Sequence, residues 1–437
     1  MNANNRHGLI WLVPLIFLVA IIGLELTGVV SLASGVREWV RGDLGRFVPR
    51  PAFADRAELF YAAVAGLGIV MQFSQRKLFK AGIVAVGAIL AAIIISWRAE
   101  IDGRIFLDAA FPSFVIATVF LLGRVMHAMQ VSADREDMQR ALAPRLGPTR
   151  AATIARRPER LGLPGQTRDV TCLVCRLRGF SHLADANNMD ASGVAAFSRK
   201  VMTPLWQTIL DNGGMIDHVA PGTLTAFFNA PLDDPEHFEN ACQAALTMIE
   251  HIKPINNELE KELHVGGAPI ARVQIGIGIE SGACVVGNFG TDDCPEYSVA
   301  GHAVERAGEI EFLCAKYGPA IIVGEAARAA ADARFAFLEV DKLYAGANAE
   351  GVPIFALLGN AIVRTSPKFR ALQTFHEHIF QTYRARQWDK TRALIEQCRA
   401  LSSPAPILYD LYLARIAYYE SNPPGQDWNG VFVPAQN

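Results

Sequence analysis

The sequence predicts an α+β protein in which four apolar helices precede a domain built on one antiparallel-rich sheet covered by helices, with a helical hairpin after it. Apolar residues make up 51% of the 437 residues, and they concentrate before position 128. Between positions 169 and 360, strand-like and helical stretches alternate, which is typical of a sheet with helices packed on it. The sequence therefore divides into a transmembrane region (1–128), a helical connector (129–168), an α+β domain (169–360) and a helical hairpin with an extended tail (361–437).

Four apolar runs predict four transmembrane helices, at Leu9–Ala33, Leu59–Phe73, Ala81–Trp97 and Ala109–Gly123. A helix needs about 20 apolar residues to cross a bilayer, with a range of about 17 to 25. The first and third runs meet this requirement by themselves, whereas the second and fourth need flanking residues. The first run is too long for the apolar core of a signal peptide, so we expect it to span the membrane.

Positive charge in the short loops predicts the orientation. The segment Gln75–Lys80 contains three basic residues and no acid, which places it in the cytoplasm together with both termini. The loop Val36–Glu58 then lies on the far side. Glu25 is an ionisable residue within the first span, and two interpretations stay open: a functional group in the membrane, or a residue at the far interface.

Composition excludes several classes of function. A net charge of −2 gives no reason to expect a nucleic-acid partner. The seven cysteines are odd in number and have no paired spacing. They therefore do not indicate a disulfide framework. Cys172 and Cys175 form a C-x-x-C pattern, but residues three apart on a strand point to opposite faces. Because the histidines also lack metal-ligand partners at useful spacing, we expect no metal ion and no cofactor.

The domain from 169 to 360 contains a series of predicted elements. Helices are expected at Ala195–Asp211 and Ala303–Tyr317, and a strand at Val170–Leu177. Two hairpins are predicted: one from Met215–Val219 and Leu224–Phe228 around Pro221-Gly222, the other from Val273–Ile279 and Ala283–Gly287 around Glu280–Gly282. Spaced apolar residues between Pro367 and Asn422 suggest a hairpin of tetratricopeptide type.

Four segments of this domain resemble the catalytic domain of class III adenylate/guanylate cyclases: Val170–Ser181, Asn212–Pro231, Ile275–Gly290 and Glu296–Glu311. The last three spans, the connector and the tail Pro423–Val431 look like bacterial membrane cyclases that carry a CHASE2 sensor between their first two spans. Here only Val36–Glu58 occupies that place, so the sensor looks deleted. The resemblance implies a multi-pass protein of a bacterial inner membrane.

The resemblance also implies where a catalytic site would lie. Class III cyclases act as dimers, and two aspartates of one protomer hold two metal ions against the nucleoside triphosphate. An asparagine and an arginine of the other protomer stabilise the transition state. A lysine with an aspartate or threonine reads the purine, and further lysines contact the phosphates.

None of these family residues is retained in this sequence. The two metal-ligand positions fall on Arg176 and Gly222, and the two purine-reading positions on His218 and Ser298. The transition-state asparagine and arginine fall on Glu305 and Glu309, and the phosphate-contacting lysines on Ala345 and Ala347.

These replacements oppose the family's chemistry. Arg176 places a fixed cation where divalent cations would bind, and Gly222 supplies no side-chain ligand. Glu305 and Glu309 would repel a triphosphate, since two unit charges at a separation of about 4 Å interact by about 4 kcal/mol at an effective dielectric constant near 20. Because each family site combines both protomers, neither a homodimer nor a heterodimer with an intact cyclase would contain a complete site.

The sequence therefore predicts a catalytically inactive protein that serves as a scaffold or accessory subunit of a membrane complex. Two alternatives stay open: a cyclase with residual or altered activity that makes cyclic AMP from ATP, and a dominant-negative regulator that pairs with active cyclases. The expected partners are membrane lipid, proteins bound through the cyclase-like domain or the spans, and a second copy of the chain. Arg176 is further predicted to pair with Glu305 or Glu309 of the partner subunit, unless these positions have simply drifted.

Overall fold

The structure is a computed structural model, and it describes residues 12–27, 53–75, 77–103, 107–162, 164–180, 190–263, 272–291, 294–331, 334–345, 348–400, 406–425 and 428–432, with positions 35 and 185. The chain separates into two compact units, Met1–Met138 and Gln139–Asn437. Each unit is described by itself below.

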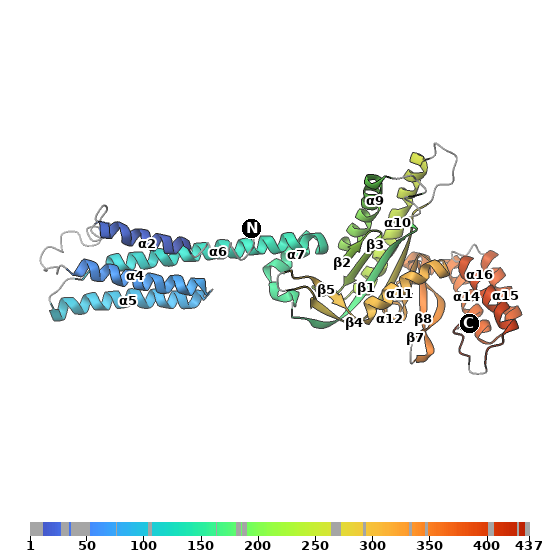
Figure 1. Ribbon diagram of the computed structural model, residues 1–437. Coiled ribbons are helices and arrows are strands. Elements are labelled where there is room, and N and C mark those ends of the chain that lie inside the picture. The colour runs from blue at the N-terminus through green and yellow to red at the C-terminus, as the bar shows by residue number, and fades with distance from the viewer. Residues whose placement is uncertain are drawn as a thin grey trace. The chain divides into compact units, whose positions relative to one another are not determined.

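The first unit consists of apolar helices (Figure 1). They are α2 (Leu12–Thr27), α4 (Ala54–Ser74), α5 (Leu78–Gly103) and the first part of α6 (Ala110–Leu146). Three of them, α4, α5 and α6, are long and apolar enough to cross a membrane. They contain the second, third and fourth predicted spans. Within the predicted first span the structure describes α2, whose 16 residues are fewer than the roughly 20 that a span needs.

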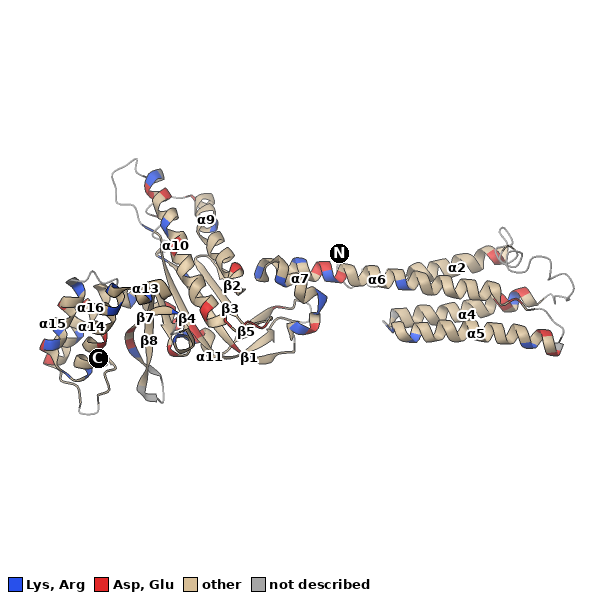
Figure 2. Cartoon of the chain, turned by 180° about the vertical axis from the view of Figure 1, so that it is seen from behind, with Lys and Arg blue, Asp and Glu red and all other residues tan. Residues whose placement is uncertain are grey.

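Charged residues in the first unit lie mainly towards the helix ends, as Figure 2 shows. The exposed side chains between those ends include Phe60, Leu90 and Ile94, each at least half exposed. The far-side loop was predicted to end at Glu58, but this boundary is wrong, because α4 already begins at Ala54. Glu58 is buried and accepts a hydrogen bond from the Asp108 backbone N–H at 2.7 Å, so it belongs to the helix bundle.

Two short helices lead from α6 into the sheet of the second unit. These are α7 (Pro148–Arg156) and the 3₁₀ helix η2 (Pro158–Leu161). Each begins with a proline, whose missing N–H is unneeded in a first helical turn. Gly147 separates α6 from α7 with φ at 84°, a conformation that favours glycine.

The second unit is built on an eight-stranded sheet with the strand order β2-β3-β1-β4-β6-β8-β7, in which β5 pairs with β4. The strands are β1 (Gln166–Arg178), β2 (Met215–Ala220), β3 (Thr223–Phe228), β4 (Gln274–Asn288), β5 (Tyr297–Ala300), β6 (Ile321–Gly324), β7 (Phe335–Ala345) and β8 (Asn348–Asn360). Only the β4–β6 pairing among them is parallel. The prediction of an antiparallel-rich sheet covered by helices is confirmed, and so is the hairpin around Pro221-Gly222.

The second predicted hairpin is wrong, because Glu280–Gly282 is not a turn. Strand β4 runs without interruption from Gln274 to Asn288 and pairs with β1 along its length. Thr171 lies opposite Ser281, and Val170 lies opposite Gly282. Pairing with β1 therefore satisfies the backbone polar groups of these residues, and a polar triplet in the sequence does not need to turn.

The two faces of β4 carry different helices (Figure 1). Ile275, Ile277 and Ile279 point into an apolar core that includes residues of α9 (Ala191–Asp211) and α10 (His237–Leu263). The alternate residues Gly276 and Gly278 face α11 (His302–Tyr317). Because side chains alternate along a strand, the pattern Ile-Gly-Ile-Gly-Ile gives one bulky face and one face that a helix can approach closely.

The C-terminal residues form several helices packed on the sheet. They follow α12 (Glu325–Ala331), β7 and β8, and comprise α13 (Ala361–Thr365), α14 (Pro367–Arg384), α15 (Trp388–Ala400) and α16 (Pro406–Ser421). Their helical nature agrees with the sequence, while the tetratricopeptide likeness stays a prediction. A buried ion pair between Arg415 and Asp341, 2.7 Å apart, joins α16 to β7.

Candidate functional site

The two predicted metal-ligand positions lie next to each other at the end of the β1–β3 ladder. Arg176 on β1 pairs with Thr223 on β3, and the Leu177 N–H donates to the Gly222 carbonyl at 2.7 Å. Gly222 lies in the β2–β3 turn with φ at 76°. The structure therefore brings Arg176 and Gly222 together.

Arg176 is held by a carboxylate of the same chain. Its Nε lies 2.9 Å from Glu311 Oε2, and the Glu311 side chain is only 3% exposed whereas that of Arg176 is 50% exposed. Glu311 belongs to α11, which crosses beneath this end of the sheet. A Cβ on Gly276 would lie 2.7 Å from Glu311 Oε1 and 3.1 Å from Arg178 Nε, so the glycine leaves the room that the ion pair occupies.

Sequence reasoning missed Glu311 as the partner of Arg176. The signal that could have found it is the pair of glycines at 276 and 278, since glycines within a strand mark a close approach of another element. The predicted pairing of Arg176 with the partner subunit's Glu305 or Glu309 stays a prediction, because it concerns a second copy of the chain.

Burial raises the pKa of the Glu311 carboxyl above its ordinary value, and the nearby Arg176 and Arg178 guanidinium groups offset part of this shift. A carboxyl whose pKa is raised by folding stabilises the protein in its protonated form. Its favourable contribution is present below the ordinary glutamate pKa of 4.5 and is lost as the pH rises through the raised value. By pairing with the ionised Glu311 carboxylate, the Arg176 guanidinium reduces this loss of stability at neutral pH.

Changing Arg176 to leucine is expected to lower the free energy of unfolding by about 1–2 kcal/mol at pH 7, because a buried carboxylate loses its hydrogen-bonded partner while Arg178 remains nearby. The loss should shrink as the pH falls through the raised pKa of Glu311, below which the carboxyl is neutral in the folded protein. Denaturant titrations of the variant and the native protein at several pH values measure this difference. An Arg176→Leu effect independent of pH, or one that persists in a Glu311→Gln background, would contradict the proposed pairing.

The two predicted purine-reading positions also lie close together, on β2 and β5. The Ser298 hydroxyl donates to Asp217 Oδ1 at 2.6 Å, and His218 is the exposed residue that follows Asp217. The β2–β3 register shifts between Ile216 and His218, and such a bulge re-aims a side chain. Burial raises the pKa of Asp217, while the Ser298 hydrogen bond opposes that shift. Sequence reasoning did not assign a role to Asp217.

Arg145 fixes this pair of strands from the end of α6. Its Nε donates to the Ile216 carbonyl at 2.8 Å, and its Nη2 donates to the carbonyls of Asp217 and Tyr297 at 2.8 and 2.9 Å. One guanidinium thus connects β2 to β5. The last turn of α6 is therefore attached directly to the strands that carry His218 and Ser298.

The two predicted transition-state positions lie on one exposed face of α11. Glu305 and Glu309 are one helical turn apart and both exposed. Phe312, on the same face, is 72% exposed. Glu309 Oε2 lies 3.0 Å from Arg306 Nη1.

Of the two predicted phosphate-contacting positions, the structure describes Ala345, at the end of β7. Ala345 pairs with Asn348 through the backbone. Ala347 lies outside the described residues, so its place is not assigned. Neither alanine offers a charged or hydrogen-bonding side chain.

No group of three or more histidine, cysteine, aspartate or glutamate side chains in the parts of the chain that the structure describes is arranged to hold a metal ion. At the position expected for metal ligands, the side chain present is a guanidinium, which donates hydrogen bonds and cannot coordinate a cation. The residues at this place do not fit a divalent ion.

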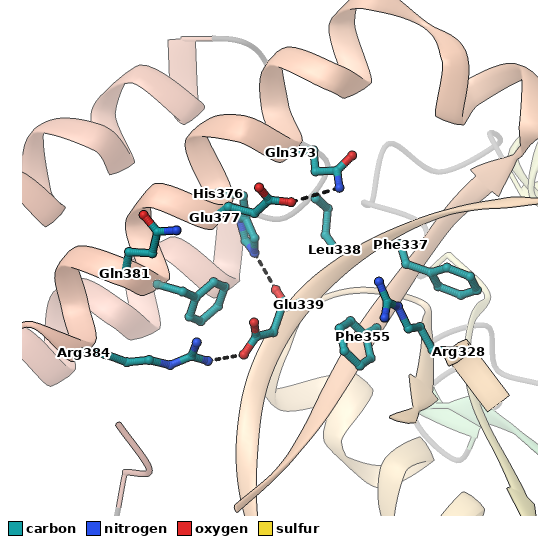
Figure 3. Close-up of a pocket in the computed structure, with 11 residues that line it drawn as sticks. Arg328, Phe337, Leu338, Glu339, Phe355, Gln373, His376, Glu377, Gln381 and Arg384 are labelled. Atoms are coloured by element: carbon teal, nitrogen blue, oxygen red, sulfur yellow. Dashed lines mark hydrogen bonds and ion pairs between the residues drawn. The ribbon is translucent and has the colours of Figure 1, made fainter. Parts of the chain in front are cut away.

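Apart from the predicted site positions, a cavity of about 370 Å³ lies between α12, the β7–β8 hairpin and α14. Figure 3 shows Arg384 paired with the Glu339 carboxylate and His376 bonded to the Glu339 carbonyl oxygen. Gln373 donates to Glu377 at 3.0 Å, and burial lowers the pKa of His376 to about 4. Because these polar groups bind each other, we interpret the cavity as a gap in the packing contact between α14 and the sheet.

Comparison with known proteins places this domain among nucleotide cyclases. A sequence profile described as the adenylate and guanylate cyclase catalytic domain matches residues 223–350. An adenylate cyclase of Anabaena cylindrica is 29% identical over 159 residues, which are 36% of this chain and 30% of that protein. Adenylate cyclase 1 of Rhizobium meliloti (strain 1021) is 24% identical over 159 residues, 36% of this chain and 23% of that protein.

Among solved structures, the adenylyl cyclase CyaB from P. aeruginosa is similar with a TM-score of 0.38 and 22% identity, over 44% of this chain and 95% of that one. The match covers less than a third of the length of each of these two curated relatives.

Proposed function

The second unit of this chain contains a class III adenylate/guanylate cyclase catalytic domain, and from that premise we propose that the protein is a membrane-bound, catalytically inactive relative of the cyclases that acts as a scaffold or accessory subunit. The proposal places the three long apolar helices in a bacterial inner membrane and the cyclase-like domain in the cytoplasm. It concerns the chain's own role, since the match covers less than a third of each of the two curated relatives.

The observation that carries the proposal is the ion pair between Arg176 and Glu311. The guanidinium stands where the family's metal-binding aspartate would stand, and a buried carboxylate 2.9 Å away holds it there. To admit a divalent ion, Arg176 would have to leave, and Glu311 would then be a buried charge without this partner. That cost opposes metal binding in addition to the repulsion between the cations.

The exposed face of α11 supports a role in assembly. Phe312 is 72% exposed beside Glu305 and Glu309, and aromatic residues are enriched at protein–protein interfaces relative to the rest of the surface. We propose that this face meets a partner protein or a second copy of the chain. Charges next to an aromatic anchor would set which partner binds.

The proposal predicts that the purified full-length protein forms no cyclic AMP from ATP and no cyclic GMP from GTP above background with Mn²⁺. The reason is that neither predicted metal position offers a carboxylate. Product is measured by chromatography, with an active class III cyclase assayed in parallel as the control. Turnover that disappears in an Arg176→Ala or Glu309→Ala variant would overturn the proposal and favour an enzyme with altered ligands.

The scaffold role is separated from cyclase silencing by the partners that co-purify. We expect purification in mild detergent to recover membrane proteins unrelated to cyclases, and replacement of Phe312 with aspartate to reduce that recovery. Recovery of intact cyclases alone would instead favour a dominant-negative regulator.

A further inference from the structure

A cleft of about 640 Å³ lies on the α11 side of β4, away from the Arg176–Glu311 pair. It is bordered by the middle of β4, the first turns of α11, the start of α12 and Val352 on β8. Its ionisable or hydroxyl-bearing lining residues are Glu280, Ser281, His302, Arg306, Glu309 and Glu325. A concave site of this size with a few polar groups is suited to a small molecule.

Arg306 is the unusual residue of this cleft. It is 9% exposed, and its Nη1 lies 3.0 Å from Glu309 Oε2. Its Nη2 is buried and has no hydrogen-bond partner within the described residues. A buried N–H without an acceptor lowers stability, and more so when the group is charged, so an acceptor that reached this guanidinium would be bound favourably.

The same cleft also carries an excess of carboxylates. Glu280 is buried and accepts the Ser281 N–H at 2.9 Å. Burial raises its pKa, while Arg306 is among the groups that lower it. Glu309 and Glu325 are exposed at the rim. Three carboxyl groups therefore line the same cleft as one guanidinium that has a spare donor.

We propose that this cleft binds a small zwitterion of the α-amino acid class, with its carboxylate on Arg306 and its ammonium group among Glu280, Glu309 and Glu325. A modest rotation of the guanidinium towards the cleft lets Nη2 donate to the ligand carboxylate, which is the acceptor that it lacks. Arg–carboxylate contacts are commonly bidentate, which suits a carboxylate placed in this way.

Ligands with one kind of charge fit less well. A simple anion would be repelled by the three carboxyl groups, and a simple cation would leave the spare donor of Arg306 unsatisfied. A nucleoside triphosphate would be repelled more strongly than a simple anion, because it carries a much larger negative charge. The inference does not rest on the proposed function, because it uses a cleft that contains only one of the degenerate family positions, Glu309.

The test is isothermal titration calorimetry of the full-length protein in detergent with the standard L-amino acids. At least one is expected to bind, with basic ones such as L-lysine favoured by the acidic rim. For L-lysine, the analogue without the carboxylate is 1,5-diaminopentane, and the analogue without amino groups is hexanoate. Each analogue should bind at least tenfold more weakly, because 1,5-diaminopentane loses the carboxylate contact and hexanoate loses the ammonium contacts.

Two variants test the assigned contacts. Arg306→Leu, a change to an apolar side chain at a buried position, should abolish binding. Glu309→Gln replaces an exposed side chain with one of the same shape, so this variant should fold even if Arg306→Leu does not. It should weaken binding several-fold. The control is Glu396→Gln, because Glu396 has the same geometry: it pairs with an arginine three residues away and is 63% exposed, against 62% for Glu309.

Binding by Glu396→Gln at native strength, together with loss in the two cleft variants, would support the site. The inference is overturned if no amino acid binds, if the analogues bind as well as the amino acid, or if both cleft variants bind like the native protein. These outcomes are independent of the cyclic nucleotide assay.

Discussion

Replacing Arg415 with leucine is expected to lower the free energy of unfolding of the second unit by about 3–5 kcal/mol, because it leaves Asp341 as a buried charge without its cationic partner. The two side chains are 3% and 4% exposed and lie 2.7 Å apart. Asp341 also accepts the Tyr317 hydroxyl at 2.5 Å. One ion pair therefore joins α16, β7 and the C-terminal end of α11.

The aromatic surroundings of Arg415 add to this expected loss. Its guanidinium carbon lies 4.7 Å from the ring centre of Phe432 and 5.0 Å from that of Tyr412. Cation–π contacts of this kind are stronger where water is excluded. A leucine would keep some apolar contact but would lose both the charge and the cation–π contacts.

Denaturant titration followed by tryptophan fluorescence measures the effect, since Trp428 lies close to Tyr419 in the same cluster, with ring centres 5.0 Å apart. Arg399→Leu serves as the control, because Arg399 also pairs with an aspartate on α16, Asp410, but the two side chains are 35% and 68% exposed. An exposed pair of this kind contributes about 0–1 kcal/mol. Equal effects of the two substitutions would show that burial of the Arg415 pair is unimportant.

This expectation changes how the C-terminal region is understood. Position 361 was predicted to begin a separate segment, and the sequence pattern gave no reason to connect Arg415 with Asp341, which lie 74 residues apart. Amphipathic spacing indicates that a helix has an apolar face, but it does not indicate which surface that face covers. The long-range ion pair was thus invisible until the fold placed the two residues together.

The local elements of the cyclase-like domain were more accessible to sequence reasoning. Pro221-Gly222 predicted a turn correctly, because proline and glycine restrict or permit specific backbone angles. Glu280–Gly282 predicted a turn wrongly, because polar residues also occur inside strands when a neighbouring strand satisfies their backbone. Pairing with β1 makes Glu280–Gly282 part of a strand instead of a turn. A short stretch of sequence does not show which strand will pair with it.

Sequence reasoning named positions for the candidate site but did not find the contacts that these residues make. The resemblance assigned Arg176 and Gly222, and the structure brings them together. The resemblance did not identify Glu311 as the partner of Arg176, because that contact depends on how closely α11 approaches β4. It also did not identify the hydrogen bond from Ser298 to Asp217, which depends on a bulge in β2. Both contacts follow from three-dimensional packing that sequence spacing does not determine.

The close approach of α11 to β4 leads to the second large effect that we expect. Changing Gly278 to alanine should lower the free energy of unfolding by about 3 kcal/mol, because the added methyl group overpacks a helix–strand contact. Its Cβ would clash with the Ala307 carbonyl oxygen and lie 2.5 Å from the Glu311 backbone nitrogen. Backbone atoms cannot move aside as the end of a flexible side chain can, so α11 itself would have to shift.

Gly308→Ala provides the matched control for this change. Gly308 lies on α11, and a Cβ there would have no atom within 4 Å. Alanine at that position should stabilise the helix by about 0.5–1 kcal/mol, since glycine is unfavourable within a helix. Denaturant titrations of the two variants should therefore show shifts of opposite sign, and a destabilising Gly308→Ala would mean that this face of α11 is covered.

The Gly278→Ala variant also tests whether the Arg176–Glu311 pair depends on this packing. A shift of α11 away from β4 lengthens the distance between Glu311 and Arg176, so the further loss caused by Arg176→Leu should be smaller in the Gly278→Ala background than in the native protein. A double-mutant cycle measures that coupling. Strictly additive effects would show that the ion pair forms independently of how closely the helix lies on the strand, and the barrier to metal binding would then rest on Arg176 and Glu311 alone.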